Sequence, residues 1–363
     1  MKKINVLLIN YSLGVGGIEK LLLEFCKNSH KNHTEYKFHI VVFSSLKGIE
    51  EEFSKYDVNI ISLNKKHGID FELISKLTKV IEDLNIDIVH SHAQNTWLYG
   101  VLASRKTKKP IISTIHSGTY KYGFVKRFRW DLLSFLLSIY TDKIITVGMH
   151  LRQDLLRVGV RKKKVVSIHN GVNVEDFSGE HTADVENSLI IVARLCFQKN
   201  HMLLFEAINI VMRVIPDIKL YVVGDGELRN ILEEYIAENK LEDNIFMLGR
   251  RDDISNLLNK KSIFVLPSII EGLPVSLLEA MSSKKAIIAS DIPANREVVS
   301  DNRSALFVDP KSSADIANKI IKLYKDKDLQ EKLSSQAFID VKKNFSFDVM
   351  TERYIDLYRD VLS

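Results

Sequence analysis

Short runs of valine, isoleucine and leucine alternate along this chain with longer segments whose apolar residues recur every three or four positions. In the first half the apolar runs cover 4–10, 38–43, 58–63, 87–92, 111–116, 143–148 and 165–170. Continuous apolar runs separated by amphipathic segments are typical of parallel strands that helices cover on both faces. The first half therefore predicts one doubly wound α/β domain.

A polar, aperiodic segment at 172–187 interrupts this pattern, which then restarts. The later runs cover 189–194, 218–224, 244–249, 262–267, 286–290 and 305–309. We therefore predict two Rossmann-like parallel-sheet domains, 1–172 and 173–345, with a closing helix at 346–363 that joins the first. Ligands of such sheets bind beyond the carboxyl ends of the strands, so we expect the active site in a cleft between the domains.

Composition narrows the classes of protein that fit this pattern. The 363 residues are 45% apolar and 27% charged, as in a globular protein, and no run of 18 apolar residues predicts a spanning helix. The start of the chain lacks the pattern of a signal peptide, and the two cysteines exclude a disulfide framework and a four-cysteine zinc site. We expect a cytoplasmic protein.

Charge is distributed unevenly. Residues 1–175 hold 27 Lys/Arg and 16 Asp/Glu, giving 27 − 16 = +11, and the rest hold 24 and 30, giving 24 − 30 = −6. A basic half is compatible with nucleic acid, an anionic membrane or an acidic substrate, and net charge alone does not choose among them.

The stretch SIIEGLPVSLLEA, residues 268–280, carries the first candidate site. Pro274 suits the first turn of a helix, predicted at about 274–283, whose free N–H groups and dipole favour an anion. Gly272, followed by Leu273, allows a phosphate to approach, while Glu271 and Glu279 suit the neutral hydroxyls of a sugar and a ribose. The arrangement fits a nucleotide sugar. The alternative is that Glu271 only stabilises the helix dipole and Glu279 is a solvated helical residue.

Two cations follow the first strand of the second half. Arg194 and Lys199 stand in ARLCFQKN, where they are placed to neutralise a diphosphate leaving group. That role would make a metal unnecessary, and no Asp-x-Asp at a strand end predicts a magnesium site. The alternative is that Arg194 is an ordinary surface residue.

Glycines follow the first strand of the chain, in NYSLGVGGIEK. Gly16 and Gly17, with Gly14, resemble a phosphate-cradling turn, although the spacing differs from the dinucleotide fingerprint. A tight turn that needs positive φ explains them equally well.

Other candidates stand at the ends of predicted strands. His116 is placed to contact a sugar hydroxyl or the acceptor, or it is a core histidine, and His90 and His92 lack an evident third metal ligand. Gly224 and Arg250 are placed to contact the nucleotide and its base, and surface turns explain both equally well.

A basic and apolar segment at 120–139 suggests a membrane contact. A helix of this composition fits the surface of an anionic leaflet and access to a lipid-linked acceptor. The alternative is a core helix, because some of its apolar residues recur at core spacing. Those residues are Phe128, Leu132, Phe135, Leu136 and Ile139.

Taken together, these motifs resemble glycosyltransferase family 4, which has the GT-B fold. The resemblance covers nearly the whole chain and includes E-x7-E at Glu271 and Glu279 and Arg-x4-Lys at Arg194 and Lys199. It also includes the glycine loop at 14–19, the strand-end histidine at 116 and the segment HNGVN at 169–173. Two departures stand out: Asn173 replaces an aspartate, and Lys284-Lys285-Ala286 replaces Gly-x-Pro.

The resemblance implies a retaining glycosyltransferase that makes a cell-surface polysaccharide or glycoconjugate, and the two cations lead us to expect that it needs no metal. It implies a UDP-sugar donor, with a GDP-sugar using much the same residues, and a saccharide or lipid-linked acceptor. The basic and apolar segment at 120–139 adds the expectation of a peripheral contact with the inner face of the membrane. The resemblance also implies a front-face mechanism in which the leaving diphosphate helps to deprotonate the acceptor. The catalytic residues implied are Arg194, Lys199, Glu271 and His116. The donor-binding residues predicted with it are Gly16, Gly17, Gly272, Leu273, Pro274 and Glu279, to which the strand-end positions add Arg250 and Gly224.

Three other functions compete with this one. A nucleotide-sugar isomerase on the same scaffold would convert the donor with no acceptor present. A nucleotide-sugar-binding protein would bind tightly without turnover. A nucleic-acid binder would show salt-steep binding, but no recognition motif supports it.

Overall fold

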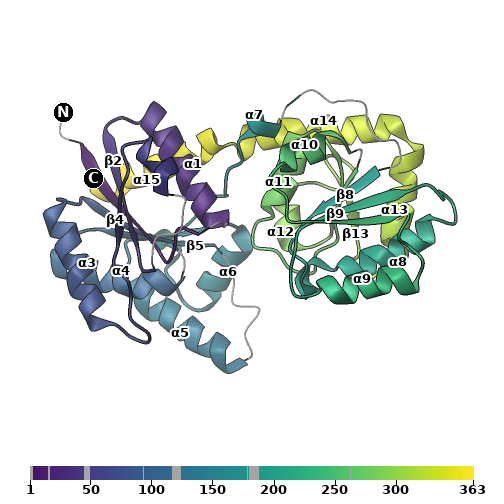
Figure 1. Cartoon of the computed structure of the whole chain (residues 1–363). Coiled ribbons are helices and arrows are strands. Elements are labelled where there is room, and N and C mark those ends of the chain that lie inside the picture. Colours follow the sequence, from purple (N-terminus) through teal and green to yellow (C-terminus); the bar gives the residue numbers. More distant parts are fainter. Residues whose placement is uncertain are drawn as a thin grey trace. The chain divides into compact units, whose positions relative to one another are not determined.

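The computed structural model describes residues 3–14, 17–44, 50–92, 94–116, 124–177, 179, 188–261 and 263–363, with only the backbone for 124–127. The chain divides into two compact units (Figure 1). Unit 1 comprises Met1–Gly171 and Phe347–Ser363, and unit 2 comprises Val172–Ser346. Among the described residues, no helix has both the length and the apolarity needed to cross a bilayer.

Unit 1 is built around a parallel sheet of seven strands in the order β3-β2-β1-β4-β5-β6-β7. Its strands are β1 (Ile4–Asn10), β2 (Tyr36–Val42), β3 (Asn59–Ser62), β4 (Ile88–His92), β5 (Ile111–Ile115), β6 (Lys143–Thr146) and β7 (Val165–Ser167). Its helices are α1 (Gly17–Asn32), α2 (Glu50–Ser54), α3 (Phe71–Asp83), α4 (Gln94–Thr107), α5 (Phe124–Tyr140), α6 (Met149–Arg157), the 3-10 turn η1 (Lys162–Lys164) and α15 (Phe347–Leu362).

Unit 2 repeats the plan with six parallel strands in the order β10-β9-β8-β11-β12-β13. Its strands are β8 (Ser188–Val192), β9 (Lys219–Val223), β10 (Ile245–Gly249), β11 (Ile263–Leu266), β12 (Ala286–Ser290) and β13 (Leu306–Val308). Its helices are α7 (Val174–Phe177), the 3-10 turn η2 (Phe197–Lys199), α8 (His201–Val211), α9 (Arg229–Glu238), α10 (Ile254–Asn259), α11 (Val275–Ser282), α12 (Pro293–Arg296), α13 (Ser313–Lys325) and α14 (Lys327–Asn344).

Both sheets reverse their strand order once, between β1 and β4 in unit 1 and between β8 and β11 in unit 2. The central strands β4, β5 and β12 are buried along their whole length, as expected for parallel strands that helices cover on both faces. At a reversal, the loops after the two neighbouring strands diverge and leave space for a ligand at the carboxyl edge. The predicted fold class is confirmed for each unit.

The closing helix α15 belongs to unit 1. Tyr354, Ile355 and Tyr358 are fully or almost fully buried there, and the Tyr354 ring lies 5.4 Å from that of Phe25 on α1. Figure 1 shows the final yellow helix beside the purple strands of unit 1. The end of the chain therefore completes a core that its beginning starts.

Helix α5 turns to solvent the residues that the core-helix interpretation placed inside. Phe128 is 62% exposed and Ile139 is 52% exposed, and Leu132, Phe135 and Leu136 are exposed too. The buried side of the helix carries Ser134, Leu137 and Ser138 instead. For the five residues named in it, the core-helix interpretation is wrong.

The carboxyl end of α5 is fixed by a lysine from η1. The Lys164 ammonium donates to the carbonyls of Ser138, Ile139 and Thr141 at 2.9, 2.9 and 2.7 Å. These are carbonyls that the end of a helix leaves without a partner, and a cation there also favours the helix dipole. The helix that carries these exposed apolar residues is therefore held in place at its carboxyl end.

Candidate functional site

A lysine and a glutamate meet at the point where the unit 2 sheet reverses. Lys199, at the end of η2 after β8, donates to the two carboxylate oxygens of Glu271, in the loop after β11, at 2.6 and 2.8 Å. The side chains are 21% and 7% exposed, respectively. The two residues are predicted to have separate ligands, a diphosphate and a sugar, but in this structure they bind each other.

The backbone around this pair is held by hydrogen bonds between the same two loops. The Ile269 amide donates to the Gln198 carbonyl at 2.8 Å. Asn200 has φ of +59°, which an asparagine tolerates, and its side-chain amide donates to the carbonyls of Pro267 and Pro310. Lys199 and Glu271 are therefore positioned by a fixed frame rather than by their own attraction alone.

Helix α11 begins at Val275, four residues after Glu271. Pro274 is the residue before the helix, not its first residue, so α11 is slightly shorter than predicted. The amides of Leu277 and Leu278 both bind the Pro274 carbonyl, which leaves the amides of Val275 and Ser276 without an intrahelical partner. A free helix N-terminus thus stands beside the Lys199–Glu271 pair and offers donors to an anion.

Other predicted donor residues line the same loop and helix. Gly272 is half-buried in the turn, and Leu273 and Pro274 are buried beneath it. Glu279 lies in the second turn of α11 and is half-buried. The E-x7-E spacing therefore places one carboxylate before the helix and one along it.

The loop after β9 packs tightly against the loop after β8. Gly224 has φ of +138°, and a Cβ there would lie 2.0 Å from the Ala193 carbonyl oxygen. The Gly224 amide donates to the Gly249 carbonyl at 2.8 Å. This glycine is thus required by internal packing. Arg194 and Arg250 follow β8 and β10 in the same region, and both are exposed.

At the matching edge of unit 1, the described glycines are in open space. A Cβ at Gly14 or at Gly17, the first residue of α1, would meet nothing within 4 Å, and neither has a positive φ. The tight-turn explanation therefore fails for these two residues. Gly16 lies outside the described residues.

Three histidines gather at the same edge of unit 1. His90 and His92 extend from β4 to one face, and His116 follows the adjacent strand β5. Nδ1 of His92 lies 3.3 Å from Nε2 of His116, and the rings of His90 and His92 are 4.2 Å apart. Nδ1 of His90 contacts the Tyr358 hydroxyl of α15 and Nε2 contacts the Thr114 hydroxyl, each at 2.7 Å.

Burial keeps these rings uncharged near neutral pH. Desolvation lowers the pKa of His90 to about 3 and that of His116 to about 4, and it lowers the pKa of His92 too. Although they are adjacent, they do not form a metal site: no group of three or more His, Cys, Asp or Glu in the described part of the chain could hold a metal ion. The contact between His92 and His116 was not predicted from the sequence. The only sequence signal for it is the His-x-His spacing of His90 and His92 on a buried strand.

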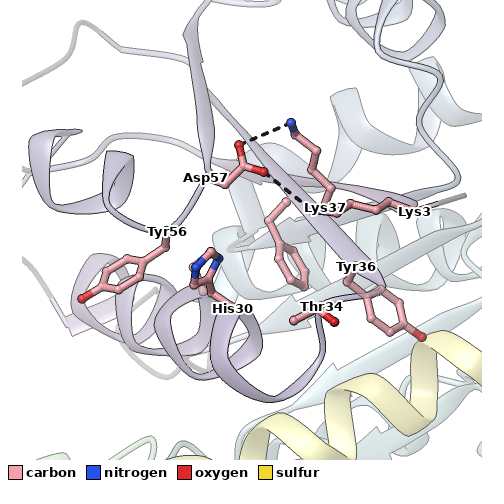
Figure 2. Close-up of a pocket in the computed structure, with 9 residues that line it drawn as sticks. Lys3, His30, Thr34, Tyr36, Lys37, Tyr56 and Asp57 are labelled. Atoms are coloured by element: carbon pink, nitrogen blue, oxygen red, sulfur yellow. Dashed lines mark hydrogen bonds and ion pairs between the residues drawn. The ribbon is translucent and has the colours of Figure 1, made fainter. Parts of the chain in front are cut away.

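A small pocket of about 110 Å³ lies elsewhere in unit 1 (Figure 2). It stands at the amino ends of β1, β2 and β3, opposite the edge where ligands of such sheets bind. Its lysines Lys3 and Lys37 both pair with Asp57, as the dashed lines in Figure 2 show. We do not assign it to the predicted chemistry.

Two parallel-sheet α/β units, with a pair of opposite charges where the sheet of unit 2 reverses, define the structural class of this protein. Residues 15–176 match the family described as Glycosyltransferase Family 4, and residues 174–339 match that described as Glycosyl transferases group 1. The chain belongs to family 4 of the glycosyltransferases, with the GT-B fold. The resemblance inferred from the motifs is confirmed.

Individual relatives agree with this assignment. The chain is 28% identical to "UDP-Gal:alpha-D-GlcNAc-diphosphoundecaprenol alpha-1,3-galactosyltransferase" of Escherichia coli over 81% of its length and 80% of that protein. A solved glycosyltransferase from Rickettsia africae superimposes with a TM-score of 0.87 at 23% identity, covering 100% of both chains. Anabaena Alr3699/HepE, solved with UDP and glucose, gives a TM-score of 0.82 at 16% identity over 98% of this chain and 99% of that one.

Proposed function

We propose that this protein is a retaining glycosyltransferase that moves a hexose from a UDP-sugar to a lipid-linked or saccharide acceptor in the assembly of a cell-surface polysaccharide or glycoconjugate. The observation that carries the proposal is the Lys199–Glu271 pair beside the free N-terminus of α11. The name of the Escherichia coli relative, with its UDP-galactose donor and diphosphoundecaprenol acceptor, supports the choice of donor and acceptor.

The ion pair suggests how a donor is recognised. A diphosphate arriving at the α11 N-terminus competes for the Lys199 ammonium, because two phosphate charges attract it more strongly than one carboxylate. Glu271 then accepts hydrogen bonds from sugar hydroxyls, while Glu279 accepts them from the ribose. Since Glu271 is only 7% exposed, the exchange leaves its charge facing the ligand rather than water.

The same groups supply the chemistry of the leaving group. As the bond from the sugar to the diphosphate breaks, negative charge grows on the diphosphate, where Lys199, Arg194 and the α11 N-terminus stabilise it. The acceptor oxygen attacks from the face that the diphosphate leaves, and the diphosphate takes the acceptor proton. No metal takes part in this scheme.

The test is a screen of the purified full chain against UDP- and GDP-sugars by thermal shift and by nucleotide release. Selective binding of UDP-sugars, weakened in Lys199→Met but not in the surface control Lys332→Met, supports the proposal. Undiminished turnover in EDTA and an unchanged anomeric configuration, read by NMR of the product, support the metal-free and retaining parts. Conversion of the donor with no acceptor would instead indicate an isomerase, and absence of any nucleotide-sugar binding would overturn the proposal.

We also propose that α5 docks on the anionic inner face of the cell membrane. The exposed apolar residues of α5 lie beside exposed cations: Arg129 on the helix itself, and Lys162 and Lys163 in the turn that anchors its end. An apolar stripe bordered by basic residues is the pattern of an interfacial helix.

Flotation with vesicles tests the docking. The protein should float with phosphatidylcholine–phosphatidylglycerol vesicles more than with pure phosphatidylcholine. Phe128→Ser with Leu136→Ser should reduce the bound fraction at least about tenfold, since each large apolar side chain contributes roughly 1.5–3 kcal/mol when it leaves water. Ile339→Ser, at a residue that is 56% exposed on α14, is the matched control. Equal flotation of all variants would rule the surface out.

A further inference from the structure

The histidine cluster of unit 1 carries an inference about which atom holds a proton. His116 stands at the end of β5, where its ring is half-buried at the carboxyl edge, and His92 is 1% exposed beneath it. Nδ1 of His92 lies 3.3 Å from Nε2 of His116, within reach of a hydrogen bond. Because burial keeps both rings neutral, each carries one proton, and one ring must donate to the other.

Two arrangements satisfy this contact, and they differ at the far nitrogen of His92. Nε2 of His92 is buried and has no hydrogen-bond partner in the described part of the chain. If Nε2 of His116 donates to Nδ1 of His92, the proton of His92 is on its Nε2, where the N–H group has no acceptor. If Nδ1 of His92 donates instead, Nε2 of His92 has only a lone pair without a donor. Buried N–H groups without a partner are the rarer case in proteins, because their desolvation is not compensated.

We infer that His92 is a positioning residue that donates from Nδ1 to Nε2 of His116 and thereby fixes the proton of His116 on Nδ1. His116 then presents an N–H group to the edge of the sheet, so it donates a hydrogen bond to a substrate hydroxyl oxygen and does not act as a base there. This inference rests on the proposed function for the substrate, but the position of the protons does not.

The neighbours of His92 are arranged to hold its ring in place. His90 is fixed at both nitrogens by the Tyr358 and Thr114 hydroxyls, and its ring packs on that of His92 at 4.2 Å. The rings of His92 and His116 stack in turn, with centroids 5.5 Å apart. A continuous series of contacts therefore extends from Tyr358 on α15, through His90 and His92 on β4, to His116 at the end of β5.

The first test reads the protons directly. The full chain, labelled with ¹⁵N-histidine, is measured by two-dimensional NMR that correlates the ring nitrogens with the carbon-bound ring protons, with assignments from His92→Asn and His116→Asn. A free imidazole carries its proton mainly on Nε2, so protonated Nδ1 in both His92 and His116 at pH 7.5 is the expected and diagnostic result. A proton on Nε2 of His116 would overturn the inference whatever the enzyme does.

The second test asks whether the donated hydrogen bond matters. His92→Asn keeps an amide donor at the position of Nδ1, His92→Gln moves it to that of Nε2, and His92→Leu removes it. With the nucleotide sugar that the wild type turns over, we expect kcat of the Asn variant within about threefold of wild type. The Gln and Leu variants should fall about tenfold with KM little changed, as for the loss of one hydrogen bond. Equal kcat in all three would overturn the positioning role. If no nucleotide sugar is turned over, the proposed function fails and the NMR result decides the inference alone.

Discussion

The two units share one architecture but place different chemistry at the same edge of the sheet. In unit 2 the loops at the reversal bring together opposite charges, Lys199 and Glu271, beside a free helix N-terminus. In unit 1 the corresponding edge holds the neutral rings of His92 and His116. The ring of His92 packs on that of His90, which contacts the hydroxyls of Thr114 and Tyr358. A doubly wound sheet thus decides where a ligand binds, while the side chains after each strand decide whether charge or neutral hydrogen bonding recognises it.

The largest expected difference in stability between the two units comes from adding one methyl group at a glycine in each. Gly224→Ala in unit 2 should cost at least about 3 kcal/mol of stability or prevent folding, since it forces a side chain into positive φ and against the Ala193 carbonyl. Gly17→Ala in unit 1 should keep or raise stability by up to about 1 kcal/mol, because its Cβ enters open space in a helix. Urea unfolding followed by circular dichroism measures both.

These two glycines also separate packing from binding. If Gly17 lies at a phosphate site, Gly17→Ala should weaken UDP-sugar binding while leaving the unfolding curve intact. A Gly224→Ala protein as stable as the wild type would show that the close contact in unit 2 is not a constraint.

A large effect on turnover is expected at the ion pair. Lys199→Met should lower kcat about 10²- to 10³-fold, as does the loss of one preorganised group that stabilises the charge of the leaving group. It should also destabilise unit 2 by roughly 1–3 kcal/mol, because the Glu271 carboxylate stays buried without its partner. Steady-state kinetics and thermal unfolding measure the two effects.

The double variant Lys199→Met/Glu271→Gln distinguishes the causes. It should recover most of the lost stability, since no unpaired charge remains, and none of the activity. Recovery of activity together with stability would mean that the pair is structural and that the diphosphate is held elsewhere.

Lowering the pH should reduce the stability of unit 1 more than that of unit 2. Buried histidines with lowered pKa are neutral in the native state, whereas the unfolded chain takes up protons below about pH 6.5, so stability falls as pH falls from that value toward the native pKa. For His90, with a native pKa of about 3, the loss is about 2 kcal/mol at pH 5. His92 and His116 add to it in unit 1, while unit 2 has His201, with a pKa lowered to about 4.

Hydrogen–deuterium exchange between pH 7 and 5, corrected for intrinsic rates, locates the loss. Peptides from β4 and β5 should lose protection more than peptides from β8 and β11. His201→Leu serves as a control, because neither ring nitrogen of this buried residue has a partner among the described residues and an apolar side chain removes its titration. Equal loss in both units would contradict the assignment of acid sensitivity to the cluster.

Much of this comparison was predictable from sequence, because the alternation of apolar runs reflects burial on both faces of a parallel sheet. The residues at strand ends were predictable too, since the edge is a property of the topology. The pairing of Lys199 with Glu271 was not, because these residues are 72 positions apart and meet only when β8 and β11 become neighbours in the sheet.

The direction in which α5 faces was not predictable either, because the helix is apolar on more than one side. Leu133 and Leu137 pack against the core while Phe128 and Leu132 face solvent at the same helical spacing. Periodicity gives the spacing of a stripe and not the partner that it meets.

The smallest effect concerns the departure from the family pattern at 284–286. Lys284 has φ of +49° at the end of α11, where its amide binds the Met281 carbonyl and that of Lys285 binds the Ala280 carbonyl. These bonds form a Schellman motif, whose left-handed position favours glycine. The buried ammonium of Lys285 donates to the Lys261 carbonyl at 2.8 Å, which gives the second lysine a structural role of its own.

Lys284→Gly should therefore stabilise unit 2, but by less than the roughly 1 kcal/mol that relief of positive φ gives. The reason is that the Lys284 ammonium also lies 4.8 Å from the centre of the Phe338 ring, a contact that contributes roughly 0.5–1 kcal/mol at an exposed site. Lys108 in unit 1 has φ of +53° and closes α4 in a similar way, with the Lys109 amide on the Ser104 carbonyl. Lys108→Gly should gain the larger amount, and a greater gain at Lys284 in urea unfolding would show that the ring contact contributes nothing.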